Sequence, residues 1–370
     1  MRDTAARVLE LAERQGFALA GIAPSQPSPR ADAVRAWVAD GRHGSMAYLE
    51  ANLDVRLDPD QLLPGAKSVI AVCDAYHPGP AGPEEATEGS TPKPARGKVA
   101  RYAWGDDYHK VLKQRLHALA DGLTELLPGE RFRSTVDTAP ALERELAAAA
   151  GLGWQGKNTM LIHPRHGSYT LLGLIVTTAA LPTSEDLDFP GATVPAADHC
   201  ANCTRCIDAC PTDAIAAEGY SIDATRCVSY LTIEHRTPID DALLPGVGDW
   251  LAGCDICQEV CPYNEAGRRN PLPVHPRYDP RPRELSRGLE LSEVLSWTAE
   301  DRARAFRGSA LKRIKLDMIR RNALIVAGNV LATREHAALR DAVRACLEDE
   351  ADLVRETARQ VWGRIESSAV

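Results

Sequence analysis

Hydrophobic and polar residues follow two different periods in the first half of the chain. The opening residues 1–23 have the spacing of an amphipathic helix, with charges throughout. Apolar runs predict strands over 66–76, 132–137 and 169–178, whereas helical periodicity predicts helices over 109–127 and 140–150. Because helices and strands alternate, residues 1–190 are expected to form a domain of the α/β or α+β class.

The pattern changes in the second half of the chain. Residues 78–97 are dense in Pro and Gly without periodicity, which predicts a mobile surface loop. A cysteine-rich module is expected over 191–266, and a proline-rich linker opens the remainder, 267–370. Helical periodicity in that remainder predicts a short HEAT-like stack of helices. Its helical segments are 291–306, 312–331, 334–349 and 351–365.

Composition narrows the class of protein. The chain has 370 residues, 44% of them hydrophobic and 25% charged, which is enough for two or three domains with proper cores. No apolar run approaches the ~20 residues of a membrane span, and the charged amino terminus does not resemble a signal peptide. We therefore expect a protein of the cytoplasm without a membrane partner. We also expect a monomer.

The cysteines carry the strongest chemical signal. A cytoplasmic protein keeps its thiols reduced, so ten cysteines favour metal or redox chemistry over a disulfide framework. Cys200, Cys203, Cys206 and Cys210, followed by proline, have the spacing of the bacterial ferredoxin run, whose fourth thiolate reaches a second 4Fe-4S cluster. A lone Cys227 and the group Cys254, Cys257 and Cys261, again followed by proline, supply the remaining ligands.

Two interlocked quartets account for these eight residues. The crossed arrangement assigns one ferredoxin-like 4Fe-4S cluster to the set Cys200, Cys203, Cys206 and Cys261. It assigns the other to the set Cys210, Cys227, Cys254 and Cys257. Zinc sites or disulfides are the alternatives, and they fit the spacing less well. Cys73 and Cys346 stand alone in apolar contexts and are expected to be buried small hydrophobic residues.

A glycine-rich segment, residues 151–169, is the candidate ligand-binding segment. Gly151, Gly156 and Lys157 have P-loop spacing, but Asn158 replaces the Ser or Thr of that motif, and the segment runs from a helix to a strand. A nucleotide is therefore not expected. Close backbone approach and several polar side chains, including His163 and Ser168, suit a large ligand rimmed by amides.

Charge is unevenly distributed along the chain. The net charge is −8, yet residues 264–370 carry 20 Lys and Arg against 16 Asp and Glu. Residues 301–321 contain 8 basic and 2 acidic side chains. This segment is either a solvated helix face or the contact surface for an anionic partner.

Three motifs together resemble the epoxyqueuosine reductase family. They are the segments 136–169, 199–215 with 253–264, and 320–329, in this order, and the resemblance covers essentially the whole chain. It implies cobalamin in the first domain, two 4Fe-4S clusters fed by an external electron donor, and tRNA as substrate. The epoxide of epoxyqueuosine at the wobble position would be reduced to the alkene of queuosine.

The resemblance also implies roles for single residues. Asp137 matches the proton donor, and burial against a corrin face would raise its pKa; the alternative role is N-cap of the helix over 140–150. Arg56 and Tyr102 match residues beside the cofactor, although a surface ion pair and a core position are the simpler interpretations. The further cofactor candidates are Gly156, Lys157, Asn158, His163, Ser168 and Ser229.

Cobalamin without a protein histidine on its cobalt is the expected form. The motif D-x-H-x-x-G, which supplies a lower-face histidine in many cobalamin proteins, is missing; its nearest match is "DYHKVL", where Leu112 replaces the glycine.

The basic segment becomes a candidate surface for the anticodon stem-loop, because phosphate contacts dominate nucleic-acid affinity. The candidates are Arg302, Arg304, Arg307, Lys312, Arg313, Lys315, Arg320 and Arg321. Two alternatives stay open: a reductive dehalogenase-like corrinoid enzyme acting on a small molecule, and a non-catalytic electron carrier.

Overall fold

The computed structural model describes residues 2–76, 94–184, 197–279 and 284–367. Most of the predicted loop over 78–97 therefore lies outside the described residues. Its end does not: β3 (Arg96–Val99) is a strand. Among the described residues, no helix is both long and apolar enough to cross a bilayer.

An antiparallel sheet organises the amino-terminal half. Its order is β1 (Leu19–Pro24), β2 (Ser68–Ala75), β7 (Thr170–Thr177) and β4 (Phe132–Thr135). Three of these strands lie within the predicted apolar runs, and β1 was not predicted. Every residue of β2 is buried, because this strand is covered on both faces.

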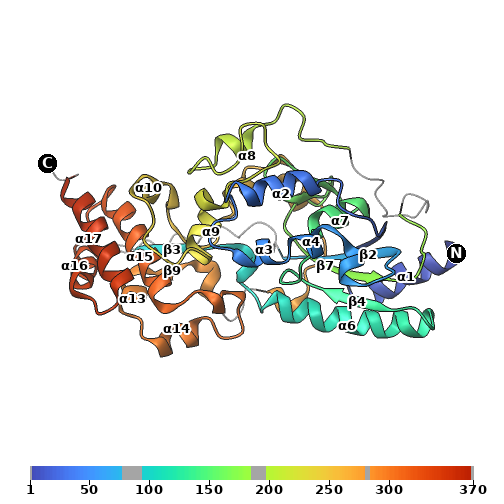
Figure 1. Cartoon of the computed structure of the whole chain (residues 1–370). Helices are drawn as coiled ribbons and strands as arrows, with labels where there is room; N and C mark the ends of the chain where they lie inside the picture. Colours follow the sequence, from blue (N-terminus) through green and yellow to red (C-terminus); the bar gives the residue numbers. More distant parts are fainter. Residues whose placement is uncertain (1, 77–93, 185–196, 280–283, 368–370) are drawn as a thin grey trace.

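Helices cover the two faces of this sheet. On one face, α1 (Arg2–Arg14) and α6 (Tyr108–Leu126) pack their apolar stripes against the strands. On the other face lies the short α7 (Glu143–Ala149). Figure 1 shows these layers at the amino-terminal end of an elongated molecule. The prediction of a mixed α and β domain is confirmed.

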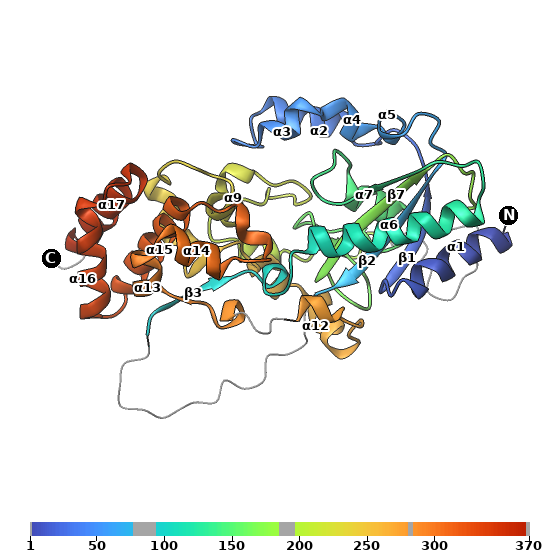
Figure 2. The same cartoon turned by 90° about the horizontal axis from the view of Figure 1, so that it is seen from below.

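A row of short helices runs along the outside of this domain. It consists of α2 (Ala31–Ala39), α3 (Ala47–Ala51), α4 (Leu53–Leu57) and α5 (Pro59–Leu62). Figure 2 shows the row extending from the sheet toward α9. The Trp37 indole donates to the carbonyl of Ile222 over 2.6 Å, which ties the row to the cysteine-rich module.

The cysteine-rich module is built from short elements between long turns. Its helices are α8 (Arg205–Asp208), α9 (Val228–Ile233), α10 (Leu244–Val247), α11 (Ile256–Glu259) and α12 (Pro262–Arg269). The hairpin of β5 (Trp154–Gln155) and β6 (Leu161–Ile162) packs beside it, with Trp154 and Ile162 against Cys261.

The carboxyl-terminal part is helical, as predicted. Its helices are α13 (Leu291–Ser296), α14 (Ala299–Ala305), α15 (Leu316–Leu331), α16 (Ala337–Ala345) and α17 (Asp352–Ser367). The predicted single helix over 291–306 is divided in two, because Thr298 forms a capping box with Asp301 and so begins α14. Helices α13, α16 and α17 pack around α15.

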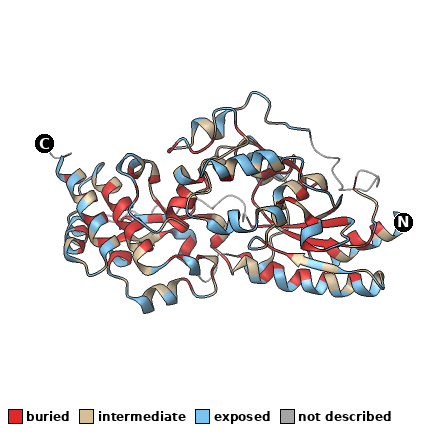
Figure 3. Cartoon of the chain, viewed as in Figure 1, coloured by how far each residue is buried: buried red, intermediate tan, exposed pale blue. Residues whose placement is uncertain are grey.

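One hydrophobic core joins this helical part to the middle of the chain. It extends from Ala95 to Ile365 and includes Leu231 of α9. A small three-stranded sheet also joins distant parts of the chain. In it, β3 lies between β8 (Trp250–Ala252) and β9 (Leu289–Glu290). Figure 3 shows buried residues both in the large sheet and around α15.

Two of the predicted phosphate-binding arginines are structural. Arg321 is 0% exposed and donates to the carbonyls of Leu231, His235 and Thr237, so its prediction as a tRNA contact is wrong. Its helix turns it toward the core, where burial lowers its pKa to about 10.

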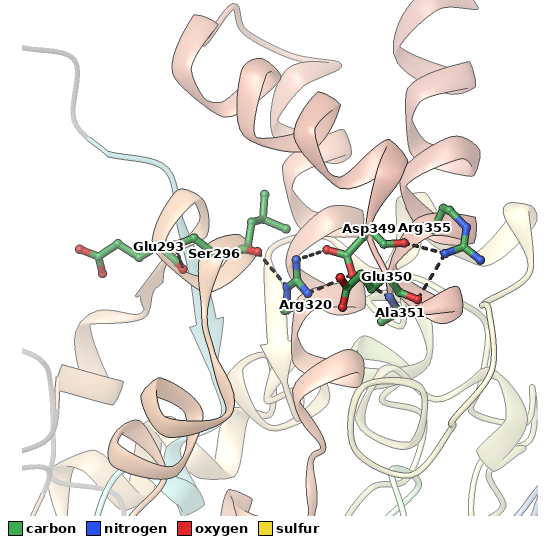
Figure 4. A network of polar contacts seen from close by, with 8 residues as sticks. Glu293, Ser296, Arg320, Asp349, Glu350, Ala351 and Arg355 are labelled. Carbon is green, nitrogen blue, oxygen red and sulfur yellow. Dashed lines mark hydrogen bonds and ion pairs between the residues drawn. The ribbon is translucent and has the colours of Figure 1, made fainter.

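Arg320 serves as a clamp between helices. Figure 4 shows it between α13 and the turn before α17, where it pairs with Asp349 and donates to the Leu295 carbonyl over 2.8 Å. Arg355 donates to the carbonyl of Asp349 over 2.6 Å and extends the network. The guanidinium of Arg320 is thus engaged within the protein, which corrects its assignment to phosphate binding.

Candidate functional site

Asp137 lies on a turn that leaves the sheet. It has φ of 42°, in the left-handed region that few residues other than glycine adopt. Helix α7 begins only at Glu143, and the residue at its N-cap position is Leu142. The N-cap interpretation of Asp137 is therefore wrong. With 44% of its side chain exposed, the carboxylate projects from the domain surface.

His109 links two carboxylates at this turn. Its Nε2 lies 2.8 Å from Oδ2 of Asp137, and its Nδ1 lies 2.8 Å from Oδ1 of Asp107. The ring stacks on Tyr108, with centroids 4.0 Å apart. Partial burial raises the pKa of Asp137, but the hydrogen bond and charge of His109 outweigh it, and the net pKa is lowered. The expected rise of the Asp137 pKa depends on burial against a corrin face and stays a prediction.

A second carboxyl group supports the turn from α7. Oε1 of Glu143 accepts a hydrogen bond from the backbone N–H of Asp137 over 2.6 Å. Burial, with the nearby charge of Asp137, raises the pKa of Glu143 to about 8. Glu143 is therefore mostly protonated at neutral pH and holds the Asp137 backbone without adding a full negative charge.

Arg56 and Tyr102 face the same region from other elements. Arg56, in α4, donates from Nη1 to the Ala141 carbonyl over 3.3 Å, while its buried Nε has no hydrogen-bond partner among the described residues. Tyr102 meets Tyr108 edge to face at 5.9 Å. Burial raises the pKa of Tyr102, and the charge of Asp137 adds to this effect.

The glycine-rich segment contacts the cysteine module directly. Lys157 donates from Nζ to the carbonyls of Ala201 and Cys203, over 2.6 and 3.2 Å. Asn158 donates to the carbonyl of Cys257 over 3.2 Å. At Gly156 a Cβ would lie 2.4 Å from the Ile162 side chain, so this glycine permits the tight turn. The P-loop interpretation is not needed to explain these residues.

The burial of His163 and Ser168 contradicts their prediction as cofactor contacts, because a group that contacts a cofactor must present surface to it. His163 is 2% exposed; its Nδ1 accepts from the backbone of Arg165 and His166, and burial lowers its pKa to about 3. Ser168 is 0% exposed and donates from N to Asn264 and from Oγ to Gln258. Both residues hold the loop in place.

Ser229 lies in the first turn of α9, two residues after Cys227. It is half-buried, and its carbonyl accepts from Thr232 over 3.3 Å.

Eight of the ten cysteines have thiols that act on one another electrostatically. All ten are free, so the disulfide alternative is excluded. Burial raises the pKa of Cys206 to about 11, and the charges of its three predicted partners add to this rise. Cys257 has its pKa raised by burial and then by Cys254, Cys227, Cys206 and Cys210. Cys206 thus acts on thiols of both predicted quartets, and the crossed assignment of the ligands stays a prediction.

The placement of these thiols bears on the zinc alternative. Within the described residues, no three His, Cys, Asp or Glu side chains converge on a single ion. A 4Fe-4S cluster binds each of its four thiolates to a different iron, so its ligands stand farther apart than those of one zinc ion. Cys73 and Cys346 are buried in hydrophobic cores, as predicted.

The remaining basic candidates are mostly on the surface. Arg304, Arg307, Lys312, Arg313 and Lys315 are exposed. Arg313 pairs with Glu234 over 2.8 Å, and these two charges act on Tyr48 and Tyr102 at the Asp137 site. Arg302 is half-buried and donates to the Ile314 carbonyl over 2.9 Å, so it stabilises the turn before α15.

Sequence reasoning missed three groups of this site. Asp107 and His109 were considered only as a failed cobalamin motif. In the structure, the His109 ring contacts the Asp107 carboxylate through one nitrogen and the Asp137 carboxylate through the other. Glu143 gave no signal, because its contact with Asp137 depends on the turn. Gln258 and Asn264 follow cluster cysteines but reach back to Ser168.

Comparison with known proteins first defines a class. A family model described as "4Fe-4S double cluster binding domain" matches residues 199–264. The cysteine module is thus that of a double-cluster iron–sulfur protein. A second model, described as "Epoxyqueuosine reductase QueG, DUF1730", matches residues 56–138, which include Arg56, Tyr102, His109 and Asp137.

Whole-chain similarity then defines the family. An epoxyqueuosine reductase of Synechococcus sp. (strain RCC307) is 40% identical over 327 residues, covering 86% of this chain and 92% of that protein. One of Alicycliphilus denitrificans is 37% identical over 356 residues, covering 95% of both. The chain belongs to the epoxyqueuosine reductase family.

Solved structures agree along the whole length. An epoxyqueuosine reductase crystallised with an epoxyqueuosine-modified stem loop of tyrosine tRNA is 28% identical, with a TM-score of 0.83 over 97% of this chain and 89% of that one. The Bacillus subtilis enzyme, also 28% identical, with a TM-score of 0.81 over 97% of this chain and 90% of that one, was captured with a catalytic aspartate loop swung out of its active site.

Proposed function

We propose that this protein reduces epoxyqueuosine in tRNA to queuosine. The observation that carries the proposal is the placement of Asp137 on an exposed, tightly held turn in a chain that also brings eight thiols together. Reduction of an epoxide to an alkene consumes two electrons and two protons and releases water. The thiols bind the electron carriers, and the Asp137 turn delivers protons.

Cobalamin is the proposed cofactor of the first domain. The buried Nε of Arg56, which has no hydrogen-bond partner in the part of the chain that the structure describes, lies next to the Asp137 turn and fits a large ligand with many amide acceptors. When bound and reduced, cobalamin supplies a strongly reducing metal centre. Arg56, Tyr102 and Ser229 are the proposed contacts, whereas Lys157 and Asn158 hold the cluster loops in position.

Asp137 is the proposed acid toward the epoxide oxygen. General acids of this kind contribute roughly 10²- to 10⁴-fold to a rate. Glu143 fixes the backbone of Asp137, and Tyr102 packs on Tyr108, which stacks on His109.

Electrons are proposed to enter beside Cys261. An open depression of about 580 Å³ lies between α8, α11 and α12; Cys261 is among its lining residues, and both signs of charge are present. Arg205 and Arg268 lie on its rim together with Asp208, Glu259 and Glu265. We assign it to the external electron donor.

The anticodon stem-loop is proposed to lie across the exposed basic residues of the tail. Arg304, Arg307, Lys312, Arg313 and Lys315 would contact phosphates, because these side chains are exposed. Helices α13 to α17 would form the HEAT-like support for this surface. A monomer in the cytoplasm is the proposed state of the enzyme.

The test is mass spectrometry of nucleosides from epoxyqueuosine-containing tRNA. The tRNA is incubated without oxygen with reconstituted protein, cobalamin and a strong reductant. Loss of one oxygen from the modified base is expected. An unchanged base, with the clusters and cobalt visibly reduced, would contradict the proposal and favour a small-molecule substrate.

A further inference from the structure

The reaction requires an acid, yet the arrangement at Asp137 favours an ionised carboxylate. His109 lies 2.8 Å from Asp137 through Nε2 and supplies the charge that lowers the pKa of this carboxyl group. A lone carboxylate with a lowered pKa holds no proton near neutral pH. The proton must therefore be stored on another group that contacts Asp137.

His109 is the group whose geometry suits this storage. Its Nδ1 lies 2.8 Å from Asp107, and a carboxylate at that distance fixes a proton on Nδ1. The second ring nitrogen then faces Asp137, so a single proton lies between Nε2 and Oδ2. Partial burial lowers the pKa of His109, but the hydrogen bonds and charges of Asp137 and Asp107 outweigh it, and the net pKa is raised.

Asp107 contacts His109 instead of capping helix α6. It occupies the N-cap position of α6, where an aspartate usually accepts from a backbone N–H of the first turn. Its side chain makes no such bond and turns to the imidazole instead. Its own backbone N–H donates to the Gly308 carbonyl over 2.7 Å, so the loop after α14 fixes its position.

We propose that Asp137 and His109 act as one acid, in which His109 stores the proton and Asp137 passes it to the substrate oxygen. This inference rests on the proposed function. Asp107 and His109 are positioning residues, since only Asp137 reaches the substrate. Neither residue adjoins a predicted cluster ligand in the sequence.

The proton balance of the reaction follows from this pair. Two electrons from the external reductant and two protons convert the epoxide to an alkene, and the epoxide oxygen leaves as water. The first proton moves from Nε2 of His109 to Oδ2 of Asp137 and on to the oxygen. His109, with 26% of its side chain exposed, then recovers a proton from water and supplies the second by the same route.

Other titratable groups around the pair set its behaviour with pH. The Tyr108 hydroxyl is a further hydrogen-bond partner of Asp137, and Glu143 and Arg144 of α7 act on the same carboxylate. The remaining groups that act on this region are Tyr48, Arg56, Tyr102, Glu234 and Arg313. The pKa of His109 in this pair is raised above the ordinary value of histidine. The rate should therefore stay constant below that raised pKa and fall as pH rises through it.

The experiment compares His109→Gln with wild type and with His117→Gln. Glutamine retains a donor toward Asp137 but stores no proton, and His117 is an exposed histidine of the same helix. Queuosine formation is measured from pH 6 to 9 at saturating tRNA, with cluster absorbance and thermal unfolding as checks of folding. We expect His109→Gln to lower the rate at pH 7 by about 10- to 100-fold and to shift the alkaline fall toward acid. The KM for tRNA should be unchanged in both variants.

An NMR titration provides a second measurement that requires no turnover. In protein with ¹⁵N-labelled histidine, the pKa of His109 should lie above its ordinary value in wild type and drop in Asp137→Asn. An unchanged rate profile in His109→Gln, or an unchanged His109 pKa in Asp137→Asn, would overturn the inference. Inactive wild type at every pH would instead contradict the proposed function, while the titration would still test the pair.

Discussion

Two polar networks of this protein differ in whether their side chains titrate near neutral pH. Behind the cysteine module, Ser168, Gln258 and Asn264 form a buried network of hydroxyl and amide groups. At the Asp137 turn, the partners are an imidazole and carboxyl groups. The first network keeps one arrangement at any ordinary pH, whereas the second changes its charge.

This difference matches the two requirements of a reduction. Electron transfer through clusters needs fixed geometry, and neutral hydrogen bonds provide it without a charge to neutralise. Proton delivery needs groups that titrate close to working pH. The glycine-rich segment connects the two networks, since it runs from α7 past the cluster loops to Ser168.

The largest expected effect comes from removing a cluster thiol. Cys257→Ala should lower the iron content from about eight to about four atoms per chain and abolish epoxide reduction. Cys346→Ala is the matched control, because that thiol is buried in the helical core. Iron analysis and the visible spectrum measure the effect; a full complement of iron in Cys257→Ala would refute the ligand assignment.

The next effect concerns the acid. Asp137→Asn should lower the rate of queuosine formation by about 10²- to 10⁴-fold, because an amide cannot donate the required proton. Its cluster spectrum and its affinity for the stem-loop should stay as in wild type. A rate within threefold of wild type would show that the proton comes from elsewhere.

The buried amide network should affect stability before it affects the reaction. Asn264→Leu leaves the Ser168 N–H and the Gln258 carbonyl without their partner, which should cost about 3 kcal/mol of unfolding free energy. Asn270→Leu, at an exposed position, should cost less than about 0.5 kcal/mol. Anaerobic denaturant unfolding compares the two, and equal losses would remove the distinction between the networks.

Glu143 predicts a dependence of stability on pH. Its folded pKa of about 8 lies above its ordinary value of 4.5, so the folded state binds this proton more tightly than the unfolded state does. The stabilisation is complete below pH 4.5 and is lost as pH rises toward 8. Glu143→Gln should therefore flatten the fall of melting temperature with pH in this range, and an unchanged slope would contradict the assignment.

The smallest effect is expected at the tRNA surface. Arg313→Gln should weaken binding of the anticodon stem-loop a few-fold. It should also reduce the slope of the logarithm of the binding constant against the logarithm of salt concentration by about 0.7 to 0.9, the contribution of one phosphate contact. Arg359→Gln, an exposed arginine of α17, is the control and should bind as wild type does. Electrophoretic titration at several salt concentrations distinguishes the two variants.

The sequence was informative where chemistry depends on local spacing. Eight cysteines in two interlocked runs predicted the double-cluster module, because cluster ligands are read from neighbouring positions. It was less informative where contacts join distant segments. Arg321 was taken for a surface residue in a basic run, although the turn after α9 surrounds it with carbonyls. His109 and Asp137 are 28 residues apart, and only the turn after β4 brings them together.

Arg321 also limits how this enzyme could have been assembled during evolution. Helix α9, which starts directly after Cys227, buries its apolar side chains in the same core as α15 and offers its carbonyls to Arg321. A tail exchanged with that of another protein would expose this core and loosen the segment that carries Cys227, a predicted cluster ligand. The helical tail is therefore not an independent unit that can be exchanged between proteins. A change of RNA specificity must arise from surface residues, while α15 keeps its buried face.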